Sequence, residues 1–99
     1  PQQAYRQPIL EALYELGGSA YVGDVLQMVE KKMKPILNEV DYQKLPSGVD
    51  IRWHNTAMWE RLNLVKEGLL KSGSPNGIWE LSDRWIQEVE KTSKNLKVS

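Results

Sequence analysis

Two side chains near the start of an amphipathic segment, Arg52 and Asn55, have chemistry suited to reading DNA bases. Arginine can donate two hydrogen bonds to guanine O6 and N7, and an asparagine amide can pair at two points with adenine N6 and N7. The competing interpretation is an ordinary solvated helix face, with the Asn55 amide bonded to the preceding loop. The same polar stripe also contains Thr56, Trp59, Asn63 and Lys66.

Basic and polar side chains close to this stripe are candidates for contacts with the DNA backbone. Lys66 and Lys71 can neutralise phosphates, which adds affinity without sequence information. Ser74, Asn76 and the amides of the glycine-containing loop around them could reach a phosphate or the minor groove. Arg61 could also neutralise a phosphate, but it projects toward the side of its helix that packs, where it could instead pair with a carboxylate.

The residue types give little support to catalysis. The chain has no cysteine and a single histidine, His54, which excludes a disulfide framework, a thiolate nucleophile and a zinc site built from nitrogen and sulfur ligands. Glu30-Lys31-Lys32 matches half of a nuclease metal site, but it lies in a predicted helix, whereas that chemistry needs the pair on a strand. We therefore expect a non-enzymatic domain with no metal, cofactor or small-molecule substrate.

Hydrophobic periodicity predicts three helices that would position these side chains. The first covers residues 8–16 and ends at a pair of glycines. The second covers 22–33 and is closed by Pro35, and the third runs from about 52 to 67 and ends at Gly68. The apolar side of the third helix is expected to contain Trp53, Ala57, Met58, Leu62, Leu64 and Val65.

The segments between these helices are less regular. Residues 19–21 are too short for more than a token strand. Asn38 could cap a short helical piece that continues through Val40 and Tyr42. Leu45-Pro46-Ser47-Gly48 has the composition of a turn.

A β-hairpin and a final helix follow the third helix in the prediction. Residues 69–71 and 78–82 are expected to pair around a six-residue loop, with Trp79 and Leu81 facing inward and Glu80 outward. The final helix begins at Ser82 or Asp83 and carries Trp85, Ile86 and Val89, and the tail 92–99 is expected to fray. Trp53, Trp79 and Trp85 are assigned to the core, whereas Trp59 could either pack or lie on the contact surface.

Three helices followed by a hairpin predict a mainly α domain with a small β-hairpin, namely a winged helix-turn-helix with a three-helix core, a wing and a C-terminal helix. We expect one such domain over residues 1–99, with its core at about 5–91. Closed against the helices, the hairpin would form the wing. The second and third helices would form the helix-turn-helix.

Several motifs resemble the N-terminal domain of Mrr-type restriction endonucleases, over about residues 5–85. They are Pro8-Ile9-Leu10-Glu11-Ala12-Leu13, Leu45-Pro46-Ser47-Gly48, Asn55-Thr56-Ala57-Met58-Trp59 with Leu62, Gly68-Leu69-Leu70 and Gly77-Ile78-Trp79-Glu80-Leu81-Ser82. The resemblance implies a DNA-recognition module of a restriction system, which helps to select foreign or modified DNA while a separate nuclease domain cuts. The family's third helix often has an arginine directly after the asparagine, where this chain has Thr56. The chain begins at Pro1 rather than Met, so we expect it to be a piece of a longer protein.

Charge placement sets the expected strength of DNA binding. The chain holds 13 Lys and Arg against 13 Asp and Glu, and its formal net charge is zero. Residues 1–50 hold five basic and seven acidic side chains, residues 51–99 hold eight and six, and residues 52–79 hold four and two. The positive excess therefore coincides with the proposed recognition helix and wing. We expect few phosphate contacts and weak binding to double-stranded DNA at physiological salt.

A second hypothesis is a winged-helix domain that binds a protein partner or forms a homodimer without touching DNA, since fold alone does not decide function. It predicts an exposed apolar patch that includes Trp59, Ile78 or Tyr42. No apolar run approaches the roughly 20 residues that a membrane helix needs, so a membrane partner is not expected. The expected location is the cytoplasm.

Overall fold

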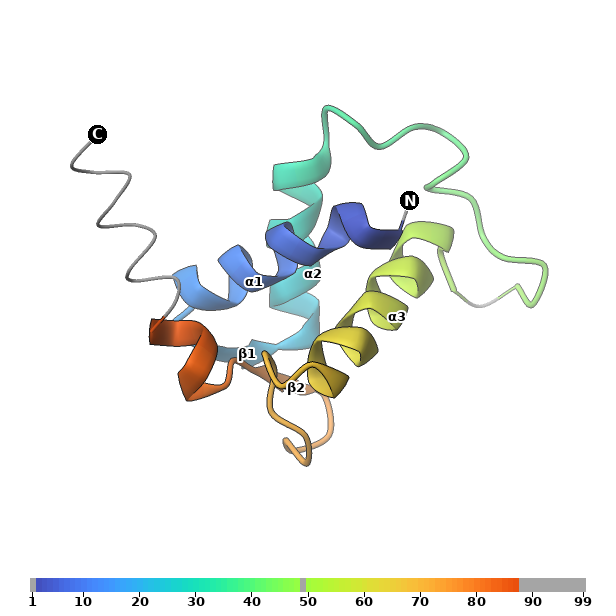
Figure 1. The fold of residues 1–99 in the computed structure, drawn as a ribbon. Coiled ribbons are helices and arrows are strands. Elements are labelled where there is room, and N and C mark those ends of the chain that lie inside the picture. The colour runs from blue at the N-terminus through green and yellow to red at the C-terminus, as the bar shows by residue number, and fades with distance from the viewer. Residues whose placement is uncertain (1, 49, 88–99) are drawn as a thin grey trace.

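The computed structural model describes residues 2–48 and 50–87 and is drawn in Figure 1. Within them the expected three helices are present, each within two residues of its predicted ends. Residues 83–87 are also helical, as expected for the start of the final helix, while Val89 and the tail 92–99 lie outside the described residues. The elements are η1 (Gln2–Tyr5), α1 (Arg6–Glu15), β1 (Ser19–Tyr21), α2 (Val22–Met33), α3 (Arg52–Lys66) and β2 (Ile78–Glu80).

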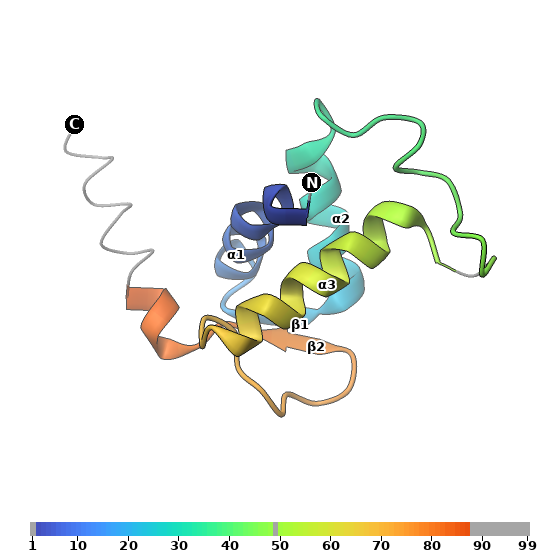
Figure 2. The same ribbon diagram turned by 45° about the vertical axis from the view of Figure 1, so that its right-hand side comes forward.

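The helices pack around one apolar core. α1 lies across α2, and η1 and α1 both contact α3 (Figures 1 and 2). α1 and α2 contribute the apolar stripes that their periodicity predicts, and Leu70, Trp79 and Leu81 close the core from the β side. None of the described helices is long and apolar enough to cross a membrane. The fully buried helical side chains include Ile9, Leu10, Leu13, Val25, Val29 and Leu64.

The sheet differs from the predicted hairpin. β2 pairs antiparallel with β1, with Ala20 opposite Trp79, so the sheet has a strand that the predicted hairpin lacked. The predicted pairing of residues 69–71 with 78–82 is present as a bridge between Leu70 and Leu81, where the Lys71 amide donates to the Glu80 carbonyl and the Ser82 amide donates to the Leu69 carbonyl, each at 2.9 Å. The token strand expected at 19–21 is confirmed as the three-residue β1, but its pairing with β2 was not predicted. Trp79 and Leu81 do face inward, as predicted.

Two glycines direct the chain into β1. Gly17 and Gly18 have φ angles of +98° and +94°, a region that side chains disfavour. The Gly18 amide donates to the Leu13 carbonyl at 2.7 Å and so ends α1. The Gly18 carbonyl then accepts a hydrogen bond from the Leu81 amide at 2.8 Å, which extends the pairing between β1 and β2.

The segment between α2 and α3 is a series of turns, so the predicted helical piece after Asn38 was wrong. The Asn38 side chain closes a turn instead, because its Oδ1 accepts from the Asp41 amide at 3.1 Å and Asp41 Oδ2 accepts from the Asn38 amide at 2.9 Å. The turn at 45–48 is confirmed by the Gly48 amide, which donates to the Leu45 carbonyl at 2.7 Å. Carbonyls of this segment then accept hydrogen bonds from the first amides of α3, which fixes where the helix begins.

The buried side of α3 is narrower than predicted. Trp53, Ala57, Glu60 and Leu64 form the buried line, at the spacing i, i+4, i+7, i+11. Met58 is 46% exposed and Leu62 is 40% exposed, so placing them on the packed side was wrong. At about 100° per residue both lie more than about 120° around the helix axis from the centre of the buried line.

Candidate nucleic-acid interface

One long side of α3 is open to solvent, and we call it the outward face of α3. Figure 2 shows α3 in front of α2, with the loop between α3 and β2 lying below α3. Trp59 is 56% exposed, which resolves its ambiguous assignment in favour of the surface. The outward face consists of Arg52, Asn55, Met58, Trp59, Leu62 and Lys66.

The polar candidates on α3 divide by what their side chains already contact. Lys66 is exposed, and half-buried Asn55 has no side-chain hydrogen bond within the described part of the chain. Thr56 Oγ1 donates to the Arg52 carbonyl at 3.1 Å, and Asn63 Nδ2 donates to Glu60 Oε1 at 3.3 Å. The structure therefore leaves Asn55 and Lys66 available to a ligand, whereas Thr56 and Asn63 bond within the protein.

Arg52 and the loop candidates vary in accessibility. Arg52 is half-buried, and its Nε is enclosed without a partner among residues 2–48 and 50–87. Lys71 and Asn76 are exposed on the loop before β2. Ser74 Oγ is enclosed and unpaired among those same residues, so in this conformation it does not reach solvent.

Sequence reasoning missed a buried carboxylate, Glu60, which is only 1% exposed. Its oxygens accept hydrogen bonds from Gln2 Nε2 at 3.1 Å and from Arg6 Nη1 at 3.5 Å, besides the bond from Asn63. The position of Glu60 on the line of Trp53, Ala57 and Leu64 is a signal that could have revealed it. A buried carboxylate needs such donors because leaving it unpaired is costly.

Arg6 also holds Glu67, the next acidic residue along the chain. Arg6 Nη1 donates to Glu67 Oε2 at 2.8 Å, and this hydrogen bond and the adjacent positive charge lower the pKa of the Glu67 carboxyl. The same hydrogen bond raises the pKa of Arg6. The carboxylates of Glu60, in α3, and of Glu67, directly after it, are thus directed toward α1. Every ionisable side chain on the outward face is therefore cationic.

Arg61 lies on the packed side of α3, as predicted, but its partner is aromatic. Its guanidinium carbon lies 5.8 Å from the centre of the Trp79 ring, which is within the range of a cation–π interaction. Within the described residues no carboxylate oxygen lies within ion-pairing distance of Arg61, so the suggested ion pair was wrong. This interaction is a contact between α3 and β2.

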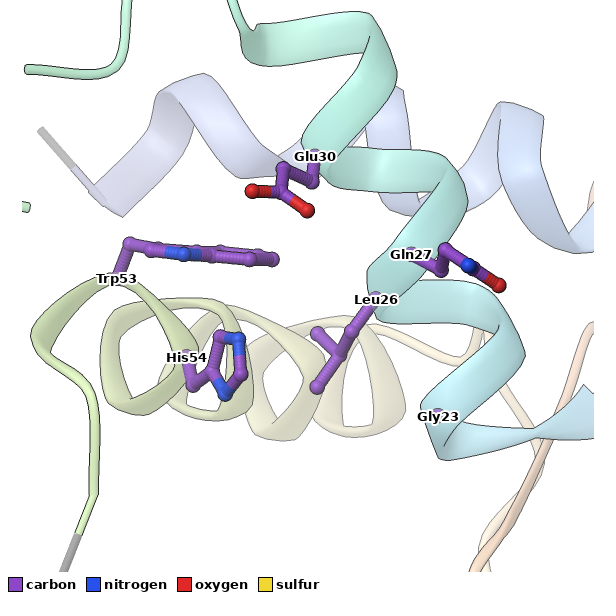
Figure 3. Close-up of a pocket in the computed structure, with 6 residues that line it drawn as sticks. All are labelled: Gly23, Leu26, Gln27, Glu30, Trp53 and His54. Carbon is purple, nitrogen blue, oxygen red and sulfur yellow. The ribbon is translucent and has the colours of Figure 1, made fainter. Parts of the chain in front are cut away.

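A hollow of about 280 Å³ lies between α2 and the start of α3 (Figure 3). Trp53 forms one wall, with His54 edge-on to its ring at 4.2 Å and Tyr5 stacked on it at 6.3 Å. Glu30 extends from α2 over the Trp53 ring (Figure 3). No cluster of three potential metal ligands occurs among the residues that the structure describes.

Partial burial makes His54 a small contributor to acid sensitivity. Desolvation lowers the pKa of His54, and the nearby charges of Glu30 and Asp50 oppose this only in part. Because the folded pKa lies below the unfolded value of about 6.5, we expect stability to fall as pH decreases through that value. In urea unfolding between pH 7 and pH 5, the free energy of unfolding should decrease less for His54→Gln than for the parent chain. Equal decreases in both would contradict a contribution of His54 to acid sensitivity.

Comparison with models of protein families matches residues 3–90 to the family described as the Mrr N-terminal domain. The match includes all of the helices and strands named above except the first residue of η1. No curated protein and no solved structure matches the chain.

Proposed function

The chain belongs to the Mrr N-terminal domain family, a part of Mrr-type restriction proteins, and from this we propose that it is the DNA-binding module of a restriction or defence protein. In this proposal the fold acts as a winged helix, with α2 and α3 as the helix-turn-helix and the loop before β2 as the wing. The module selects foreign or modified double-stranded DNA in the cytoplasm. Cleavage belongs to a nuclease domain elsewhere in the parent protein.

The observation that carries this proposal is the charge of the outward face of α3. Arg52 and Lys66 lie on that face and Lys71 follows it, while Arg6 holds the carboxylate of Glu67 on the opposite side. The major groove admits one α-helix, and the phosphates on both sides of the groove attract cations. An outward face free of carboxylates fits this environment.

The proposed contacts follow from accessibility. Asn55 and Arg52 would lie at base edges near the N-terminal end of α3, since recognition helices use these positions. Lys66, Lys71 and Asn76 would contact the backbone. The remaining sequence candidates have polar atoms that are bonded or enclosed within the domain, so they would have to rotate on binding; they are Thr56, Asn63 and Ser74.

Fluorescence anisotropy with duplex DNA at two salt concentrations tests the proposal. Lys71→Ala should weaken binding to all duplexes similarly and reduce the salt slope by about one unit, because one phosphate contact is lost. Arg52→Ala should relax the preference at one base pair. Lys34→Ala removes the same charge at the end of α2 and should leave binding unchanged. Unchanged binding in both Arg52→Ala and Lys71→Ala would disprove the proposal.

A second candidate function, self-association or protein binding, is favoured by the exposed apolar side chains of Met58, Trp59 and Leu62. Tyr42 is also exposed, whereas Ile78 is half-buried. Sedimentation of the chain with and without duplex DNA separates the two functions. A concentration-dependent dimer that ignores DNA favours protein binding.

A further inference from the structure

Three large apolar side chains occupy the middle of the outward face of α3. Met58, Trp59 and Leu62 are 46%, 56% and 40% exposed, and they lie between Asn55 toward the start of the helix and Lys66 at its end. Apolar side chains of this size normally lie in the core. The side chains that α3 contributes to the core are those of its buried line. Packing within the domain therefore does not explain why these three positions are apolar.

The surroundings of these side chains identify the chemistry of a partner. The charged groups at the two ends of the outward face are Arg52 and Lys66, with Lys71 beyond, and both nearby glutamates are held by Arg6. A matching surface is therefore anionic at its edges and apolar at its centre. In the major groove of DNA the phosphates lie at the edges, and the C5-methyl group of thymine is the apolar group among the base edges.

We infer that Met58, Trp59 and Leu62 recognise thymine through its C5-methyl group, an inference that rests on the proposed DNA-binding function. Met58 and Leu62 are one helical turn apart, so they are separated by about 6 Å along the axis. Base pairs are spaced by about 3.4 Å, so these two side chains reach thymines about two base pairs apart. Asn55, a turn earlier, then lies near an adenine of the same A·T-rich site.

The experiment compares duplexes that differ only in this methyl group. A random duplex library is enriched by binding to the chain and then copied with either dTTP or dUTP, which keeps every base pair and removes the C5-methyl groups. Affinity for both copies is measured by anisotropy at the same low salt concentration. We expect the uracil copy to bind about fourfold more weakly for each contacted methyl group, the effect of one buried methyl-sized group.

Variants of the same helix show whether the effect arises at these side chains. Leu62→Ala and Trp59→Ala remove exposed side chains and should bring the thymine-to-uracil affinity ratio toward one. Lys66→Ala should weaken binding to both copies equally and keep the ratio. Circular dichroism of each variant checks that the helices are retained.

The outcomes separate this inference from the proposed function. Equal binding of the parent chain to both copies overturns the inference while DNA binding stands. Absence of binding to either copy overturns the proposed function. A third copy made with 5-methyl-dCTP tests whether the side chains prefer the methyl group of 5-methylcytosine. Tighter binding of this copy, together with equal affinities for the thymine and uracil copies, overturns the assignment to thymine. A dimer that Leu62→Ala abolishes, with an unchanged affinity ratio, assigns the apolar side chains to a second copy of the chain.

Discussion

Replacing Arg6 by methionine should lower the free energy of unfolding by about 3 kcal/mol, the low end of the range for breaking a buried ion pair. The reason is the carboxylate of Glu60, which is almost fully buried and loses its only cationic partner within the described residues. Gln2 and Asn63 would still donate to Glu60 but cannot compensate its charge. Urea unfolding at pH 7 measures the loss.

Two further variants show that the buried carboxylate is responsible. Glu67→Ala breaks only the exposed part of the network and should cost less than about 1 kcal/mol, as surface ion pairs do. The double variant Arg6→Met with Glu60→Leu should recover most of the loss, because a well-packed apolar pair can replace a buried ion pair. A loss below about 1 kcal/mol for Arg6→Met alone would contradict this account.

Replacing Trp79 by alanine should cost about 3 to 5 kcal/mol, the range for removing a large buried aromatic side chain. Trp79 is 5% exposed, lies opposite Ala20 in the sheet and carries the Arg61 guanidinium over its ring. Small domains have total stabilities from about 5 kcal/mol upward, so this change could remove most of the folded population. Trp79→Phe keeps an aromatic ring at the same position and should remain folded, which allows a quantitative unfolding curve.

The chain contains a matched control for this substitution. Trp59→Ala deletes the same side chain from a position that is 56% exposed, so it should change stability by about 0.5 kcal/mol or less. Urea titrations followed by the remaining tryptophan fluorescence compare the two variants. If Trp59→Ala proved as costly as Trp79→Ala, the assignment of one tryptophan to the core and the other to the outward face would be wrong.

Local patterns determined most of the helical architecture. The apolar spacing in residues 8–16, 22–33 and 52–67 predicted three helices, and each appears close to its predicted ends. The inward orientation of Trp79 and Leu81 also followed from strand alternation. These predictions succeeded because helix and strand periodicity depend on neighbours within a few residues.

Most of the errors concern partners that are distant in sequence. Nothing in residues 19–21 shows that β2 pairs with them, because that pairing joins segments almost sixty residues apart. The width of the apolar side of α3 was overestimated because Met58 and Leu62 were classified by residue type, whereas burial depends on which sides of α3 the elements η1 and α1 cover.

The candidate site shows the same division. The sequence alone determined that a basic, polar helix with Arg52, Asn55 and Lys66 precedes a β segment, and its motifs indicated the family. Only the tertiary structure decided that Glu60 and Glu67 face α1, that Thr56 and Asn63 bond within the protein, and that Trp59 is exposed. The physical reason is that side-chain orientation around a helix is local, whereas the loss of solvent and the choice of ion-pair partners depend on which other elements pack against it.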